Sequence, residues 1–267
     1  MPSCLGTPRE LEIVLNGPIG PQRLHDDTVV VDEGGWYRTI TPSSSWPGAN
    51  EILFSNLNMR DPEGEIDAII GEYHGLGLPL TWCVYPWTQP SDLGNRLLAR
   101  GATQSVVLGV LGSASFPLEL VRGVEVTRVD PRSEEEYESY IGLMSAGFNL
   151  PPDEVVFRRR RYRQLIDGPD PCMHLLLARY NREVAGCCAM VVKEDSAHMT
   201  GVYVKPEFQA RGVFPSLRAA ALKYLRGIGI DLVTGHANEK SAVWVERFGS
   251  KVIYSYRIYQ LSPPSVP

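Results

Sequence analysis

The feature that most constrains the fold is an alternation of strand-like and helix-like segments from residue 51 onward. Short apolar runs such as "PLTWCVYP" and "DLVTGHA" have the length and composition of buried strands. Between such runs lie longer segments with helical spacing, for example "PEGEIDAIIGEYHGLG", where Ile66, Ile69 and Tyr73 share a face. The alternation predicts an α/β (α+β) chain with mixed sheets.

The second half of the chain has the clearer order of segments. A strand from Val124 precedes a capped acidic helix at 133–148, and an arginine-rich helix follows the prolines at 151 and 152. Residues 173–194 predict a hairpin that turns at Asn181–Glu183. Four further segments are a strand, a helix, a strand and a helix, before a last strand at 251–261.

The first half repeats part of this pattern. Its first ~50 residues are rich in turn formers and contain one predicted strand, at 28–40; further strands are predicted at 51–59, 79–86 and 104–111. The segments "GLGLPL" at 75–80 and "GIGIDL" at 227–232 both follow a helix and precede a strand. With 267 residues available, we predict two related domains, 1–123 and 124–267.

Composition narrows the class of partner. The net charge of -5 and the sequence pI of about 5.6 argue against nucleic acid and favour a small molecule or a protein. The one basic run, Arg158–Arg161 with Arg163, is interpreted as a solvated helix face rather than an anion or RNA patch.

Cysteine usage and the N-terminal sequence bear on the compartment. The five cysteines form no C-x-x-C pair, so we expect reduced thiols without a metal site or a disulfide framework. No run of 18 apolar residues and no signal-peptide pattern is present, which predicts a cytoplasmic protein that does not enter a membrane.

The seam "VYVKPEFQARGVFPSL", residues 202–217, joins a predicted strand to a predicted helix. A helix N-terminus exposes backbone N–H groups and partial positive charge, which suit an anion. Gly212 permits close approach of the backbone, while Gln209 and Arg211 add donors. Pro215 has no N–H, which leaves Gly212, Val213 and Phe214 as the useful backbone donors.

Residues 124–262 resemble the GNAT superfamily of N-acetyltransferases in element order and in this loop. That family's pyrophosphate loop reads Q/R-x-x-G-x-G/A, which aligns with Gln209 and Gly212 but places Phe214 where a small residue is usual. The first half resembles a degenerate copy of the same domain, as in tandem members of the superfamily, and has no Q-x-x-G loop.

The resemblance implies a site for acetyl-CoA, or a related acyl-CoA, without a metal. The strand before the loop would separate from its neighbour, the backbone of Val202 would hold the thioester carbonyl, and Tyr203 and Val204 would continue the strand along the pantetheine arm. The backbone from Gln209 to Phe214 would hold the pyrophosphate. The cofactor-binding set that the resemblance implies is therefore Val202, Tyr203, Val204, Gln209, Ala210, Arg211, Gly212, Val213, Phe214 and Asn238.

Acyl transfer to an amine also needs a base, because an alkylamine with a pKa near ~10 is charged at neutral pH. Regular alternation would put His198, Thr200, Val202 and Val204 on one face, and His198 lies where many family members have a glutamate base. His236 is a second candidate. The position of the family's acidic tyrosine is Val245, so we consider Tyr254 and Tyr256 as replacements.

These residues predict an N-acyltransferase that acetylates the primary amine of a small molecule or amino acid. Asp153 and Glu154 are candidates to hold a cationic acceptor. Two alternatives stay open: a non-catalytic acyl-CoA-binding protein, and an enzyme that acetylates a protein N-terminus or lysine. A tandem chain can enclose its own groove, so a monomer is expected.

Overall fold

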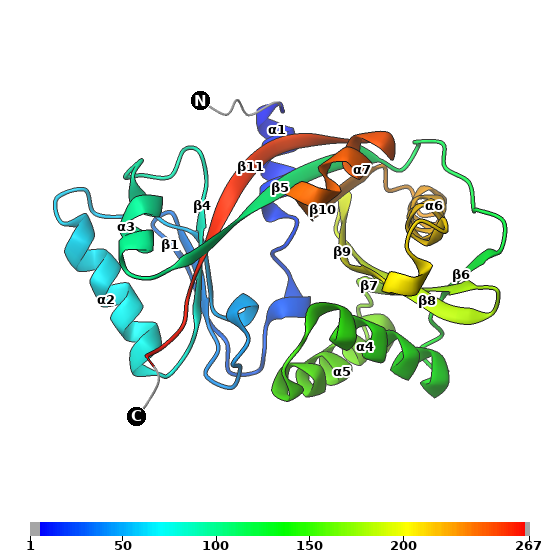
Figure 1. Ribbon diagram of the computed structural model, residues 1–267, viewed down its shortest axis with the longest axis horizontal. Helices are drawn as coiled ribbons and strands as arrows, with labels where there is room; N and C mark the ends of the chain where they lie inside the picture. The colour runs from blue at the N-terminus through cyan, green and yellow to red at the C-terminus, as the bar shows by residue number, and fades with distance from the viewer. Residues whose placement is uncertain (1–5, 265–267) are drawn as a thin grey trace. The chain divides into compact units, whose positions relative to one another are not determined.

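The computed structural model describes residues 6–264, and its contacts divide these residues into two compact units (Figure 1). Unit 1 contains Arg23–Leu108 and residues 255–264. Of the described residues, unit 2 contains 6–22 and the range Gly109–Tyr254. The chain is thus α/β in both parts, as predicted.

Unit 1 has a mixed sheet with two helices. Its strands follow the order β1-β2-β3-β4-β11-β5. Strand β2 is antiparallel to β1 and β3, β4 is antiparallel to β11, and β3 and β4 are parallel. The predicted strand at 28–40 is a hairpin, because Gly34 and Gly35 adopt positive φ and turn the chain. The elements are β1 (Val29–Glu33), β2 (Trp36–Ile40), β3 (Glu51–Phe54), α2 (Pro62–Gly75), β4 (Leu80–Val84), α3 (Leu93–Ala99) and β5 (Thr103–Ser113), with the short helix η2 (Pro47–Ala49).

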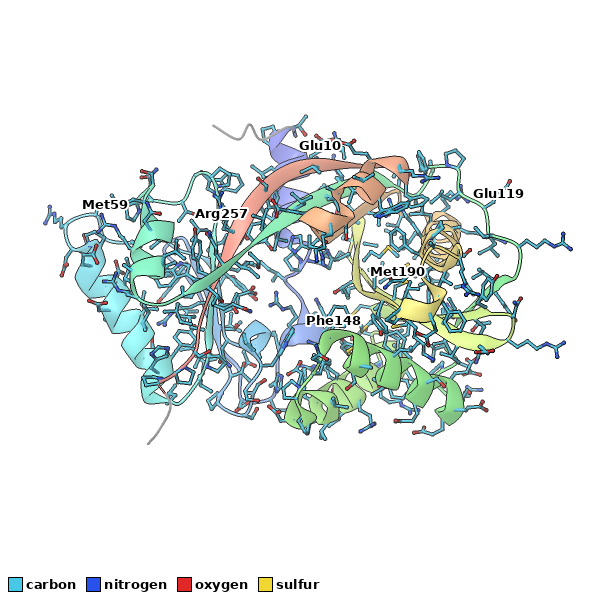
Figure 2. All side chains as sticks on the ribbon, in the orientation of Figure 1. Glu10, Met59, Glu119, Phe148, Met190 and Arg257 are labelled. Carbon is cyan, nitrogen blue, oxygen red and sulfur yellow. The ribbon has the colours of Figure 1, made fainter. Side chains whose placement is uncertain are left out.

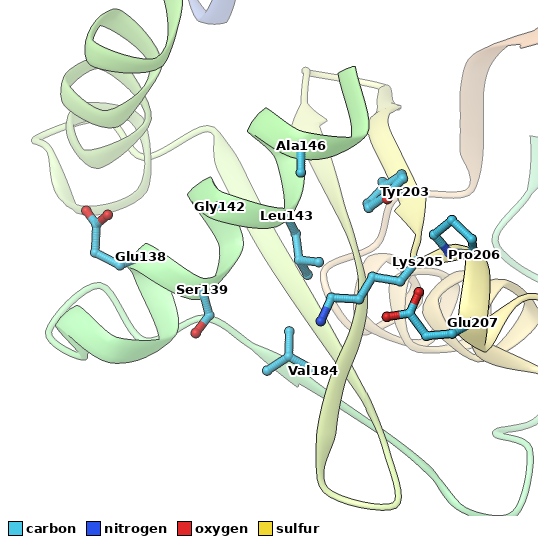
Figure 3. Close-up of a pocket in the computed structure, with 10 residues that line it drawn as sticks. All are labelled: Glu138, Ser139, Gly142, Leu143, Ala146, Val184, Tyr203, Lys205, Pro206 and Glu207. Carbon is cyan, nitrogen blue, oxygen red and sulfur yellow. The ribbon is translucent and has the colours of Figure 1, made fainter. Parts of the chain in front are cut away.

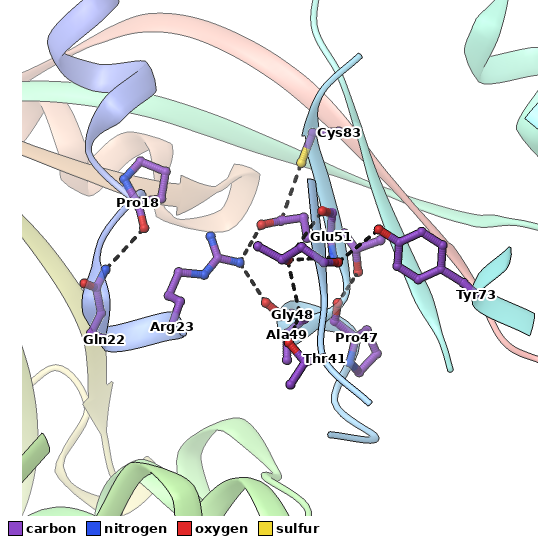
Figure 4. A network of polar contacts seen from close by, with 12 residues as sticks. Pro18, Gln22, Arg23, Thr41, Pro47, Gly48, Ala49, Glu51, Tyr73 and Cys83 are labelled. Atoms are coloured by element: carbon purple, nitrogen blue, oxygen red, sulfur yellow. Dashed lines mark hydrogen bonds and ion pairs between the residues drawn. The ribbon is translucent and has the colours of Figure 1, made fainter. Parts of the chain in front are cut away.

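The interior of unit 1 combines an apolar core with one polar network. Trp82, Tyr73 and Ile52 are fully buried in the core. Beside it, Arg23 forms an ion pair of 2.5 Å with Glu51 and donates to the carbonyl of Gly48 at 2.8 Å (Figure 4). The two charges neutralise each other, and the carbonyl of Gly48 takes a further hydrogen bond from Arg23. Charged groups are tolerated in a protein interior when they are paired in this way.

Unit 2 has the strand order β5-β10-β9-β8-β7-β6, in which β10 and β9 are parallel and β9, β8, β7 and β6 are antiparallel. The predicted hairpin is confirmed, with Asn181 and Arg182 at positive φ in its turn. The elements are α1 (Pro8–Asn16), β6 (Val124–Arg128), α4 (Glu134–Phe148), α5 (Pro152–Asp167), β7 (Met173–Tyr180), β8 (Glu183–Val192), β9 (Ser196–Val204), η3 (Pro206–Phe208), α6 (Val213–Gly227), β10 (Leu232–Asn238), η4 (Glu239–Ser241), α7 (Ala242–Arg247) and β11 (Ser250–Leu261).

Helices cover both faces of the unit 2 sheet. Helix α6 packs on β6 to β9 over a core that includes Met190, Leu217 and Leu222, and α4 and α5 cover the other face (Figures 1 and 2). In α6 the buried residues recur at helical spacing, so its apolar stripe explains its position.

The compact units differ from the expected division at residue 123. Strand β11 gives Ser255–Leu261 to unit 1, where it pairs with β4, although these residues end the second half of the sequence. Strand β5 gives residues from Gly109 onward to unit 2, where it neighbours β10. The compact units are defined by contacts within the folded chain, whereas the predicted domains 1–123 and 124–267 are defined by a repeat in the sequence. The two divisions are different quantities, so the domains 1–123 and 124–267 remain a prediction.

Helix α1 was missed, since the first 50 residues are rich in turn formers. A signal was nevertheless present: Thr7 and Glu10 form a reciprocal capping box, and Pro8 occupies the first helical turn. This helix belongs to unit 2, where it contacts β10.

The arginine run is held by internal contacts. The Arg158 guanidinium is mostly buried and donates to the Glu154 carboxylate at 2.7 Å and to the hydroxyl of Tyr162 at 2.8 Å. Arg159 pairs with Glu138, while Arg163 pairs with Glu134 over the ring of Tyr137. These pairs fix α5 to α4, so the run is better described as a structural network than as a solvated face.

The cysteines are unpaired within the described range. Cys83, Cys187 and Cys188 are buried, and burial raises the pKa of the Cys187 thiol to about 12. Such thiols stay protonated and unreactive. Cys4 lies outside the described residues. In the range 6–264, no helix is long and apolar enough to cross a membrane.

The buried position of His174 in unit 2 leads us to predict that the stability of the protein depends on pH. Burial, aided by the charge of Arg128, lowers the pKa of His174 to about 4, and its ring lies beside the Tyr224 hydroxyl. The folded protein therefore binds fewer protons than the unfolded chain between about pH 4 and 6.5, so stability falls as pH falls through this window.

We expect His174→Gln to remove this contribution. The slope of unfolding free energy against pH should flatten by up to about 1.4 kcal/mol per pH unit between pH 4 and 6.5. Urea unfolding at several pH values measures it, and an unchanged slope would contradict the assignment.

Candidate active site

The site is built around the parallel pair of strands β9 and β10 in unit 2. Strands β9 and β10 pair from Ser196–Leu232 to Met199–Gly235. Beyond that pair β9 continues to Val204 and β10 to Asn238 without pairing to each other. The backbone edges that face each other there are open to an extended ligand, which can bond to them as a further strand would.

A β-bulge lies at the start of this gap. The register between β8 and β9 shifts between Cys187 and Ala189, opposite Gly201, which has φ of 60°. A bulge changes which face the following side chains occupy. Val202 and Val204 consequently pack with Met199 on the α6 side.

The expectation that His198, Thr200, Val202 and Val204 share one face is therefore wrong. Regular alternation would place them together, but the extra residue at the bulge reverses the strand after Gly201. Tyr203 points instead to α4, where its ring packs against Gly147.

The loop after β9 has the conformation of a helix-start cradle. Ala210 and Gly212 both have positive φ, 58° and 81°, and α6 begins at Val213. The Gln209 amide donates to the carbonyl of Val204 at 3.5 Å, which bends the loop over the strand end. The N–H of Ser216 bonds to Gly212, so the free donors of this helix start are those ahead of it.

Phe214 and Arg211 both turn away from the cradle. The Phe214 ring packs edge-on against Phe248, with centroids 5.5 Å apart, and so lies toward α7. The Arg211 guanidinium lies over the Tyr180 ring at 5.5 Å. Phe214 therefore keeps its bulk off the loop, while the side chain nearest Gly212 is that of Val121.

His198 is buried on β9 beneath the end of α1. Its Nδ1 lies 2.9 Å from Thr234 Oγ1, and that hydroxyl donates its proton to the carbonyl of Ala197. These contacts hold the His198 ring against Thr234 on the neighbouring strand β10. The His236 ring stands edge-on at 5.6 Å.

The tyrosines proposed as replacement acids lie on β11 in different units. Tyr254 is buried in unit 2 over Gly109, and Tyr256 is buried in unit 1, stacked on Tyr85 with centroids 4.8 Å apart. Val245 on α7 supplies no hydroxyl. Their roles as acids remain a prediction.

Asn238 ends β10, and its side-chain oxygen accepts from the N–H and the hydroxyl of Ser241. This use as a cap fixes the turn into α7 and holds the residue at the end of the gap.

Glu154 is not available for a cationic acceptor, because it is 1% exposed and neutralised by Arg158. That expectation from the sequence is therefore corrected. Asp153 stays a candidate.

A groove of about 490 Å³ adjoins the end of β9 (Figure 3). Gly142, Leu143 and Ala146 of α4 form one wall, and Tyr203 and Lys205 form the other. No carboxylate of the described chain pairs with the Lys205 ammonium. No cluster suited to a metal ion occurs among residues 6–264 either.

The backbone at Gly17 passes so close to His198 and Thr234 that no side chain fits at this position. A Cβ at Gly17 would lie 2.7 Å from His198 Nδ1 and from Thr234 Oγ1. We predict that Gly17→Ala destabilises the protein by about 1–3 kcal/mol through overpacking, measured by urea unfolding. The control Gly71→Ala, in α2 with open space around it, should be neutral or stabilising. Equal effects of the two substitutions would contradict this packing.

Comparison with known proteins gives a consistent result. Residues 137–249 match the sequence model of the Acetyltransferase (GNAT) family. A search of curated protein sequences found no match. Solved structures of similar fold include a functionally unknown conserved protein from Staphylococcus epidermidis, with a TM-score of 0.71, 15% identity, and coverage of 92% of this chain and 99% of that one.

Two further structures share the fold at low identity. A GCN5-related N-acetyltransferase from Kribbella flavida has a TM-score of 0.62, 13% identity and 90% coverage of both chains. A tandem GNAT protein from the clavulanic acid biosynthesis pathway has a TM-score of 0.57 and 14% identity, and covers 100% of this chain and 99% of that one. The tandem neighbour supports two GNAT-like halves.

Proposed function

We propose that the chain, whose residues 137–249 match the sequence model of the Acetyltransferase (GNAT) family, transfers an acetyl group from acetyl-CoA, or a related acyl-CoA, to a primary amine of a small molecule or amino acid. The observation that carries the proposal is the gap between β9 and β10, which ends at a helix-start loop. An extended arm with an anionic end matches this combination.

The loop fits the pyrophosphate in its backbone geometry. Gly212 has no side chain and adopts positive φ, and the Phe214 ring packs toward α7. Neither residue therefore fills the cradle. The backbone of Val202 and Val204 would hold the thioester end and the pantetheine, and the cap at Asn238 would hold the far edge of the gap.

His198 is the proposed base. The His198 imidazole would take a proton from the amine, directly or through water, as nitrogen attacks the thioester carbon. The C–S bond then breaks, and the thiolate leaves. A thiol pKa near ~8.5 makes this possible without a strong acid.

A second candidate function is that of a non-catalytic acyl-CoA-binding protein. Val245 favours it, because this residue of α7 stands where the family has an acidic tyrosine and cannot donate a proton. Acetylation of a protein N-terminus or lysine is the other alternative acceptor class. A cytoplasmic location remains a prediction.

The cradle is tested by acetyl-CoA binding in a calorimeter. Gly212→Asp should weaken binding at least about tenfold, because a carboxylate near the phosphates repels them and because its Cβ would lie 2.6 Å from Val121 Cγ1 and displace the loop. Gly229→Asp is the matched control, because Gly229 also has positive φ but open space around it, after α6. If wild type does not bind acetyl-CoA, or both variants bind alike, the proposal fails.

The base is tested by the pH dependence of thiol release with a panel of amines, amino acids and peptides. His198→Ala should lower kcat about 10²–10⁴-fold near neutral pH and leave CoA affinity largely intact. The loss should shrink at high pH, where more of the amine is already neutral. An unchanged pH–rate profile would remove His198 from the mechanism, and binding without turnover on any acceptor would support the non-catalytic reading.

A further inference from the structure

Tyr140 on α4 carries a buried hydroxyl without a protein partner. The residue is fully buried, and no hydrogen-bond partner for its Oη exists among the described residues. An unsatisfied buried hydroxyl is costly, so one that persists calls for an explanation such as a ligand or a water.

The hydroxyl faces the bulge of β9. A Cβ built on Gly201 would lie 3.5 Å from Tyr140 Oη, with no other described atom within 4 Å apart from its chain neighbours. The carbonyl of Gly201 accepts weakly from Cys187 Sγ at 3.8 Å, so the backbone is held from the β8 side. Gly201 directly precedes Val202, where the unpaired length of β9 begins.

We propose that the Tyr140 hydroxyl donates a hydrogen bond to the carbonyl oxygen of the bound acyl group, beside the backbone at Val202. This assignment rests on the proposed function, because it needs an acyl thioester in the gap. The amine attacks the carbonyl carbon, negative charge develops on the oxygen, and the charge returns as the C–S bond breaks. Tyr140 keeps its proton throughout, so the step requires no further acid or base.

Two features support a donor rather than a proton-transfer role. Burial raises the pKa of Tyr140 well above its ordinary value, which keeps the hydroxyl protonated across the working range of pH. The ring is fixed by its neighbours, with the Tyr162 ring centroid 6.5 Å away, so the hydroxyl is oriented before the substrate binds. A fixed, desolvated donor is the type that stabilises a developing oxyanion most.

The chain provides a matched control one turn earlier on α4. The Tyr137 hydroxyl donates to the carbonyl of Arg159 at 2.6 Å, so it serves the fold. Tyr137→Phe should lower the melting temperature and leave kcat unchanged. Tyr140→Phe should leave the melting temperature unchanged or raise it, because it removes an unsatisfied group without changing the ring.

In turnover, Tyr140→Phe should lower kcat about 10²-fold with little change in KM for acetyl-CoA, by analogy with loss of one oxyanion donor. The defect should be the same from pH 6 to 9, unlike that of His198→Ala. Wild-type kcat in Tyr140→Phe, or a loss of melting temperature equal to that of Tyr137→Phe, would overturn the proposal.

Binding separates this proposal from the proposed function. Calorimetry with acetyl-CoA and with CoA should show that Tyr140→Phe reduces the preference for the acetylated form while CoA affinity is unchanged. If wild type binds both and the variant has the same preference and the same kcat, the Tyr140 assignment is wrong and the function stands. If wild type binds neither, both are wrong.

Discussion

The end of the pairing between β9 and β10, at Met199 and Gly235, is the constraint on which the site depends. Four residue pairs hold the two strands parallel, and beyond them the backbone edges of the two strands do not pair with each other. Backbone N–H and C=O groups need partners, so a gap of this kind is a binding surface for an extended, hydrogen-bonding ligand. The loop and helix start at the end of β9 extend that surface with donors for an anion.

The bulge at Gly201 decides which side chains meet this gap. It turns Val202 and Val204 to the α6 core, leaves His198 under α1, and leaves Tyr140 Oη facing the glycine. One inserted residue thus separates the side chains that pack on α6 from those on the other face of the strand.

Much of the fold could be predicted from local patterns, because Asn181 in the hairpin turn and Ser133 before α4 act within a few residues of themselves. The exchange of β5 and β11 between units could not, because pairing between distant strands leaves no local signal. The cradle around Gly212 was predictable from its motif. The face of Val202 was not, although a lone glycine within a strand can indicate a bulge. No sequence pattern distinguished Tyr140, because a tyrosine in an amphipathic helix is usually a residue of the hydrophobic core.

Hydrogen–deuterium exchange with and without acetyl-CoA tests the central claim, that the gap receives the acyl-CoA arm. Residues 200–204 and 236–238 should become protected, together with the start of α6, while β6 and β7 stay unchanged. Binding without protection of those segments, or with protection elsewhere only, would contradict the account.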